Sequence, residues 1–308
     1  MKDAQGRNFS VREGFDPRVD GYLYGWNFSE QWERAYEIDP ELVFITGWNE
    51  NIACKWLPQH GWEGDPFSFV DQYNWNCSRD IEPNKGWGDK GDVYYLQLVD
   101  RVRKFKGMTP AEPVSGPKTI RLRRTSDWDD VAPYFASYKG NTFHRDADGA
   151  ANMHYIDDSG RNDIVGAKVA RDSKYVYFYV ETADKLTSVS DPRWMRLFID
   201  IDRDKATGWN GYDFVLNRVG PGRSRAVLEK NDHGKWLWSA CDRVKYKVKG
   251  NILVVRIPRK ALGTGDGALD FEFKWNDNMQ DEGNVMDFYV SGDTAPGGRF
   301  NYVYTAAI

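Results

Sequence analysis

The feature that most limits the possible folds is a long series of short, β-prone segments that begins at Thr119. The strongest is Tyr-Val-Tyr-Phe-Tyr-Val, starting at Tyr175, which contains only aromatic and β-branched residues. Gly, Asp and Asn separate the segments, and helical periodicity is almost absent. This pattern predicts an antiparallel β-sandwich over residues 119–308. The expected strands are 119–123, 174–181, 195–201, 212–217, 225–229, 235–239, 244–248, 252–257, 269–275 and 285–290.

The stretch before this series has the composition of a linker. Residues 107–118 (GMTPAEPVSGPK) contain three Pro and two Gly. A chain of 308 residues is long enough for about two domains. We therefore expect an N-terminal domain over 1–107, a linker over 108–118 and a C-terminal domain over 119–308.

The N-terminal part contains one continuous apolar run, Leu-Val-Phe-Ile at residues 42–45. Such a run is typical of a strand buried on both faces, as in a parallel sheet. A short helix is expected before it at 31–38, with Ser29 as N-cap, and a second helix over 91–106. This β/α pattern supplies only part of a barrel. The predicted fold class is thus α+β multidomain: a partial (β/α) barrel segment followed by an antiparallel β-sandwich.

Trp48, Asn49 and Glu50 follow this apolar run directly. Residues just past the C-terminal end of a parallel strand occupy the position where α/β barrels keep their active sites. An indole stacks on a sugar ring, an amide binds its hydroxyls, and a carboxylate serves as acid, base or nucleophile. The alternative is an ordinary polar loop after a buried strand.

Three stretches of the N-terminal part resemble the last strand, catalytic-face loop and final helix of endo-mannosidase-like glycoside hydrolases. The Trp-Asn-Glu motif ending at Glu50 matches that family, and Glu82-Pro83 matches its later Glu-Pro pair. Asn51 and Ala53 depart from it, at a second Trp and a second catalytic Glu. The stretches are PELVFITGWNE, SRDIEP and GDVYYLQLVDRVRKFKG.

The resemblance implies a catalytic role for Glu50. Because Ala53 replaces the family's second carboxylate, the partner would be Asp80, Glu82 or a residue outside this chain. Two hypotheses follow: the C-terminal portion of a polysaccharide-acting glycoside hydrolase, or a non-catalytic glycan-binding or structural protein with a remnant barrel segment. We expect the isolated chain to be inactive as a glycosidase.

The C-terminal domain resembles family nine carbohydrate-binding modules and their DOMON-like relatives. The resemblance implies a jelly-roll-like sandwich that binds polysaccharide or oligosaccharide, or that serves as a structural appendage to a glycosidase. Trp209, Trp236, Trp238 and Trp275 are candidates for a sugar platform; the alternative for each is a place in the hydrophobic core. The stretches that carry the resemblance are YVYFYVETAD, WMRLFIDIDRDKATGWNGYDFVLNR and FEFKWNDN.

Three alternating carboxylates in this domain suit a hard cation. Asp200, Asp202 and Asp204 supply oxygens for Ca²⁺, and Asp163 and Asp213 are possible further ligands. The alternative is a solvated turn in which Asp side chains cap the backbone. We expect a structural Ca²⁺ and no organic cofactor.

The overall composition bears on partners and location. A net charge of -4 gives no basic footprint, so we expect no nucleic-acid partner. No apolar run is long enough to span a membrane, and no signal peptide is visible. A polysaccharide-acting protein would be secreted or periplasmic, as part of a longer protein. The oligomeric state is left open.

Overall fold

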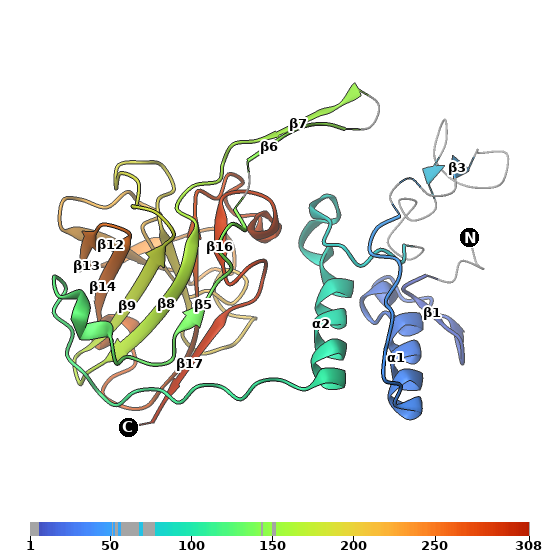
Figure 1. Cartoon of the computed structure of the whole chain (residues 1–308), viewed down its shortest axis with the longest axis horizontal. Helices are drawn as coiled ribbons and strands as arrows, with labels where there is room; N and C mark the ends of the chain where they lie inside the picture. The colour runs from blue at the N-terminus through green and yellow to red at the C-terminus, as the bar shows by residue number, and fades with distance from the viewer. Residues whose placement is uncertain are drawn as a thin grey trace. The chain divides into compact units, whose positions relative to one another are not determined.

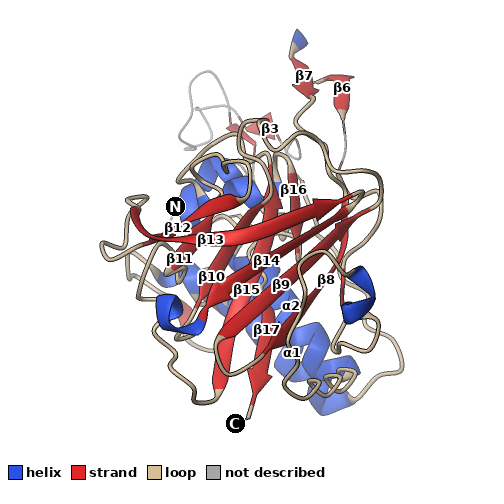
Figure 2. Ribbon diagram, turned by 90° about the vertical axis from the view of Figure 1, so that its left-hand side faces the viewer, coloured by secondary structure: helices blue, strands red, loops and turns tan. Residues whose placement is uncertain are grey.

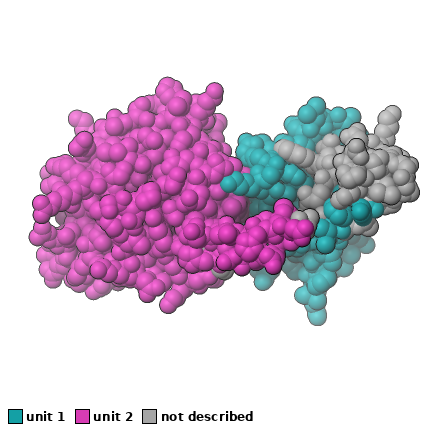
Figure 3. All heavy atoms as spheres, turned by 90° about the horizontal axis from the view of Figure 1, so that it is seen from above, with its two compact units in different colours: residues 1–110 teal, residues 111–308 magenta. Residues whose placement is uncertain are grey.

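The computed structural model describes residues 6–50, 52, 55–56, 68–69, 78–142, 144–149 and 152–307. The chain divides into two compact units, residues 1–110 and 111–308, which Figure 3 shows in different colours. The boundary falls inside the predicted linker 108–118, and we describe each unit by itself.

Unit 1 is built mainly on two helices, which Figure 1 labels. Trp32 of the first helix is buried and packs edge-on against Phe105 of the second, with ring centroids 6.1 Å apart. Phe28 and Tyr94 make a similar contact at 5.2 Å. The elements of unit 1 are β1 (Phe9–Ser10), β2 (Gly14–Phe15), η1 (Gly21–Leu23), α1 (Trp26–Ile38), β3 (Lys55–Trp56), β4 (Ser68–Phe69), η4 (Lys85–Lys90) and α2 (Val93–Lys106).

Helix α1 begins earlier than predicted. Its N-cap is Gly25 in the left-handed conformation, with φ 54°, whereas Ser29 is buried within the helix. A Cβ on Gly25 would come within 2.6 Å of Tyr94 and closer still to Gln97. Glycine is therefore required here for both its backbone conformation and its small size. Helix α2 lies close to its predicted range.

Residues 42–46 do not form the predicted buried parallel strand. Leu42 and Phe44 are 78% and 82% exposed. A parallel strand of this composition needs covering layers and neighbouring strands, and no strand among the described residues pairs with this segment. The predicted fold class, with its partial (β/α) barrel, is therefore wrong: the described chain is mainly antiparallel β.

Unit 2 contains one curled antiparallel sheet of 11 strands, and Figure 2 shows the broad face of β13, β14, β9 and β8. The strand order is β16-β15-β10-β11-β12-β13-β14-β9-β8-β5, and β17 also pairs with β15. The strands are β5 (Phe135–Ala136), β8 (Ile164–Arg171), β9 (Tyr175–Thr182), β10 (Arg196–Asp200), β11 (Phe214–Leu216), β12 (Arg225–Lys230), β13 (Ser239–Lys249), β14 (Ile252–Pro258), β15 (Leu269–Asp277), β16 (Asp293–Ala295) and β17 (Tyr302–Ala306).

The antiparallel pairing agrees with the expectation for this region, but a single sheet replaces the two packed sheets of a sandwich. Outside the sheet, β6 (Arg145–Asp148) and β7 (His154–Asp157) form a separate hairpin that projects from the unit (Figure 1). Unit 2 also contains the short 3₁₀ helices η5 (Thr125–Trp128), η7 (Arg259–Leu262) and η8 (Val285–Tyr289).

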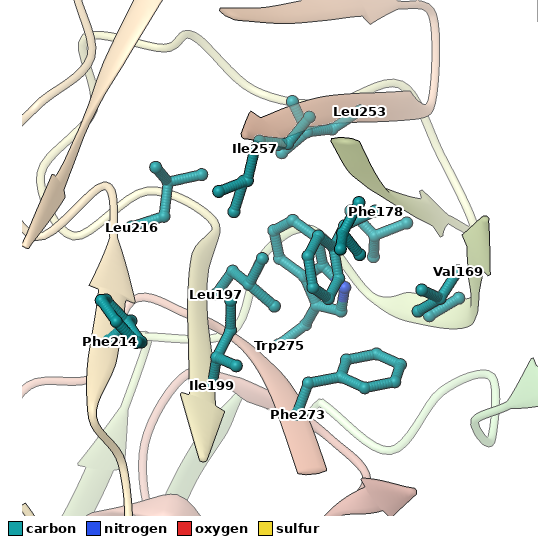
Figure 4. Packing of buried hydrophobic residues seen from close by; sticks show 14 of the residues in the cluster. Val169, Phe178, Leu197, Ile199, Phe214, Leu216, Leu253, Ile257, Phe273 and Trp275 are labelled. Atoms are coloured by element: carbon teal, nitrogen blue, oxygen red, sulfur yellow. The ribbon is translucent and has the colours of Figure 1, made fainter. Parts of the chain in front are cut away.

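The main core fills the inside of the curl. Figure 4 shows Phe178 of β9 facing Phe273 and Trp275 of β15, with Leu197 of β10 beside them. The rings of Phe178 and Phe273 lie 5.7 Å apart. Each of these side chains is removed from water, which typically contributes about 1.5–3 kcal/mol relative to full exposure.

The outer face of the sheet is covered in two places, so most strands are buried on both sides. Ile120 and Trp128 cover β8, β9 and β14, where Trp128 contacts Tyr179 at 5.1 Å. A second cluster covers Phe198 of β10 and Val215 of β11. It contains Trp209, Tyr212, Met279, Val285, Met286 and Phe288, with Trp236, Trp238 and Tyr289 packed against it.

Candidate functional sites

In unit 1 the structure brings the predicted catalytic residues together. The backbone N–H of Glu82 donates to the carbonyl of Trp48 at 2.8 Å. Asn49 Nδ2 donates to Glu82 Oε2 at 2.7 Å, and the Glu50 N–H donates to Asp80 Oδ1 at 2.7 Å. The two segments that carry the predicted residues therefore form one polar cluster.

The roles of these side chains differ. Asp80 is buried and fixes the backbone of Glu50. Glu50 is partly exposed and lies 3.2 Å from Arg79 in a surface ion pair. Glu50 and Arg79 also border a cavity of about 430 Å³ whose other walls come from α1, residues 43–47, Ile81 and Tyr94. Exposed ion pairs of this kind stabilise a fold by only about 0–1 kcal/mol. The main consequence of this pair is that a carboxylate and a guanidinium both border the cavity.

In unit 2 the acidic cluster forms with one change of membership. Asp200 ends β10, Asp202 lies in the following loop, and Asp213 precedes β11. One carboxylate oxygen from each lies within 4.8 Å of the others. Asp204, which the sequence favoured, is not in this group, and its Oδ1 accepts the Ala206 N–H at 2.9 Å. Asp204 acts as a turn-capping residue, as in the alternative considered above.

Of the three carboxylates in this cluster, Asp200 forms an ion pair with Lys205. Burial raises the pKa of Asp200, although the ammonium of Lys205 opposes that shift. Burial also raises the pKa of Asp213, and the nearby carboxylates of Asp202 and Asp200 raise it further. Lys205 bridges Asp200 and Glu272 on one side. Because Asp200 Oδ1 is buried without a hydrogen-bond partner, the donor set fits a divalent cation.

A cavity of about 800 Å³ lies beside this cluster. Asp202 and Asp213 contribute to its wall, together with Thr207, His233 and Lys260. A cation held by the carboxylates would thus lie close to a space large enough for a small ligand.

The predicted tryptophans separate into two classes. Trp275 is fully buried in the main core and presents no ring face to a ligand. Trp209 is also buried, under Trp236, with ring centroids 4.4 Å apart. Trp236 and Trp238 remain partly exposed at 5.6 Å from each other, nearly perpendicular.

Polar groups lie beside these indoles. Arg196 is buried, with its guanidinium 5.9 Å from the Trp236 ring and one nitrogen donating to Glu282. Its Nε and Nη1 have no hydrogen-bond partner, and neither has the Trp238 Nε1. Burial lowers the pKa of Arg196. Burial acts to raise the pKa of Glu282, but the hydrogen bond and the charge of Arg196, together with the charge of Arg193, outweigh it, and the net shift is downward.

Backbone geometry brings the loop that carries Glu282 close to Trp236. Gly283 has φ 87°, and a Cβ there would lie 3.0 Å from the Trp236 Cβ. Glycine allows both the conformation and the close approach.

Sequence reasoning missed Arg196, Glu282 and Arg79. The sequence did contain a pattern that points to Arg196. Alternation along β10 places Arg196 on the same face as Phe198 and Asp200, and a strand buried on that face must bury this charged side chain. Glu282 and Arg79 lie in loops, where no periodicity marks a site.

The comparisons with known proteins do not assign this chain to a family. No protein-family model matches the sequence, and no match was found among curated proteins. Among the described residues, neither helix has the length and apolar character that crossing a lipid bilayer requires.

Proposed function

We propose that this chain is a non-catalytic glycan-binding protein and that unit 2 carries the binding site, around Trp236 and Trp238. The observation that supports this most is the pair of partly exposed indoles beside buried, unpartnered donors of Arg196 and Trp238. Buried donors without partners are rare in folded proteins and suit an additional ligand or water.

The chemistry of the site matches a sugar. The apolar C–H faces of a pyranose stack on an indole, and its hydroxyls both donate and accept hydrogen bonds. Arg196 offers only donors, and the partly exposed carboxylate of Glu282 offers only acceptors. A hydroxyl-rich ligand can satisfy both at once. A secreted or periplasmic location, where polysaccharides are encountered, belongs to the same proposal.

Binding should depend on the indole of Trp236. We expect Trp236→Ala to weaken binding of a retained glycan about tenfold or more, since an aromatic contact contributes on the order of 1 kcal/mol beyond its buried area. A panel of neutral and acidic polysaccharides in affinity electrophoresis identifies the glycan, and calorimetry with its oligosaccharides measures the affinity.

The matched control lies next to it in the chain. Leu237 is 55% exposed between the two indoles, and Leu237→Ala should leave the affinity within about twofold. Retention of no glycan, or equal losses in the Leu237 and Trp236 variants, would contradict the proposed site.

We also propose that Asp200, Asp202 and Asp213 hold a structural Ca²⁺. Three carboxylates supply part of the six to eight oxygens that Ca²⁺ takes. Bound Ca²⁺ would join the end of β10 to the start of β11 and fix the loop between them.

Asp204, in the same loop, supplies the control for this cation site. Excess Ca²⁺ should raise the melting temperature by about 5 °C relative to excess chelator, through mass action. Asp202→Asn should remove that rise, whereas Asp204→Asn should keep it, because Asp204 lies outside the group. Melting curves that coincide in Ca²⁺ and chelator would reject the site.

Glycoside hydrolysis is a second candidate function, favoured by the position of Glu50 at the 430 Å³ cavity with Asp80 and Glu82 nearby. Asp80 is already engaged by the backbone of Glu50, which weakens it as a second carboxylate. The same glycans, incubated with the chain, discriminate the two functions: release of reducing ends by the wild type but not by Glu50→Gln would favour hydrolysis. We expect no release.

A further inference from the structure

Residues 42–46 (Leu-Val-Phe-Ile-Thr) are a strand-forming sequence that pairs with no strand in the described part of the chain. The segment runs nearly straight alongside α1 in Figure 1. Within the described chain its backbone N–H and C=O groups make no hydrogen bonds. Its side chains are largely exposed, Phe44 most of all. Unpaired backbone next to apolar, β-prone side chains is the arrangement to which another strand adds.

We propose that residues 42–46 pair antiparallel with the same residues of a second copy of this chain, about a two-fold axis at Phe44. This inference is independent of the glycan site in unit 2. In this register Phe44 faces Phe44, Val43 faces Ile45, and Leu42 faces Thr46. Aromatic and β-branched cross-strand pairs are those that stabilise a sheet.

Sequence on both sides of the segment favours this register. Glu41 faces Gly47, so no acidic residue opposes another, and Pro40 lies beyond the paired residues. Moving the axis to Val43 would bring Pro40 into the ladder and place Glu41 against Ile45. Moving it to Ile45 would pair Val43 with Gly47 and lose an apolar contact. The register centred on Phe44 pairs Phe44 with Phe44 and Val43 with Ile45, and it keeps Pro40 and Glu41 outside the five paired residues.

Size and symmetry set the strength and the form of the assembly. A ladder of five residues is short, so the complex should be weak and reversible. A two-fold contact uses the same surface on both copies and closes at two. The expected species is a concentration-dependent dimer.

Charge exchange at position 44 tests the register directly. Because the residue faces its own copy, Phe44→Lys alone and Phe44→Glu alone should each abolish association, since like charges lie opposite each other. An equimolar mixture of the two variants should restore it as a heterodimer. Sedimentation velocity from about 10 μM to 1 mM measures the association, and hydrogen exchange should show protection of residues 42–46 that grows with concentration.

Val19 supplies the control, because it is 95% exposed in the same unit. Val19→Lys and Val19→Glu should associate as the wild type does. A wild type that stays monomeric, lost association that the mixture does not restore, or protection of residues 42–46 in a monomer would overturn the proposal. The last result would mean that another part of the same chain pairs with the segment. Growth beyond the dimer would also contradict the two-fold contact.

Discussion

At the residue scale, Asp293 on β16 is a buried, hydrogen-bonded carboxyl group that the fold makes hard to ionise. It is buried, with Oδ2 accepting the Ile164 N–H at 2.6 Å and Oδ1 accepting the Thr294 N–H at 2.8 Å. Burial raises its pKa to about 7 despite those two donors, and the charges of Asp163 and Asp277 act in the same direction. The Arg161 side chain pairs with Asp277 rather than with Asp293.

This shift makes stability depend on pH in a defined direction. The unfolded chain releases the Asp293 proton near pH 4, whereas the folded chain keeps it to about pH 7. Between these values the folded state binds more protons, so the contribution of Asp293 to the free energy of unfolding is full below pH 4. It decreases as the pH rises to about 7, by up to ~1.4 kcal/mol per pH unit.

Asp293→Asn removes this titration. We expect the free energy of unfolding of the wild type, minus that of the variant, to fall between pH 4 and 7 and to level off above it. Denaturant titrations at each pH measure the difference. A difference for Asp293→Asn that stays flat over the same range would refute the assignment.

At the element scale, the strands with unbroken β-prone composition were predictable and those shaped by tertiary packing were not. β9 and β14 lie within about one residue of their predicted ranges. Residues 285–290 have a strand-like composition, yet 285–289 form η8. Its cap explains the difference: the Asn284 side chain accepts the Met286 N–H, and Asp287 accepts the Gln280 and Asp281 N–H groups. Local side-chain bonds to the backbone outweighed β propensity.

Two other expected strands, 119–123 and 235–239, instead pack over the outer face of the sheet. Ile120 lies in the cluster over β8 and β9, and Trp236 lies against the cluster over β10. Apolar composition indicated burial in both segments, but burial does not require strand pairing. Neither segment pairs with another strand apart from Ser239, which begins β13.

The candidate sites were predictable as sequence clusters but not in their final membership. Spacing along the chain found Asp200 and Asp202, while the third carboxylate, Asp213, was named only as a possible further ligand and lies just before the strand that pairs with β10. The sequence also grouped Trp275 with Trp236. Since both faces of the sheet are covered, alternation alone could not distinguish the indole inside the curl from the one near the surface.

At the scale of the whole molecule, unit 2 contains its own sheet and all three apolar clusters. A unit with its own core can fold alone. Its N-terminal boundary at residue 111 differs from the predicted start at 119, because part of the expected linker is packed. Val114 contacts the main core, and Ser115 and Lys118 donate backbone hydrogen bonds to Ala132 and Arg171.

Two fragments test this description of the boundary. Residues 111–308 should unfold in one cooperative transition, and residues 119–308 should do so at a temperature about 5 °C or more lower. The reason is that the shorter fragment loses the packing of Val114 and the Ser115 hydrogen bonds, each of which contributes about 1 kcal/mol. Calorimetry of both fragments beside the full chain measures the transitions. Absence of a cooperative transition in residues 111–308 would show that the sheet depends on unit 1, and equal melting temperatures would show that residues 111–118 are a free linker.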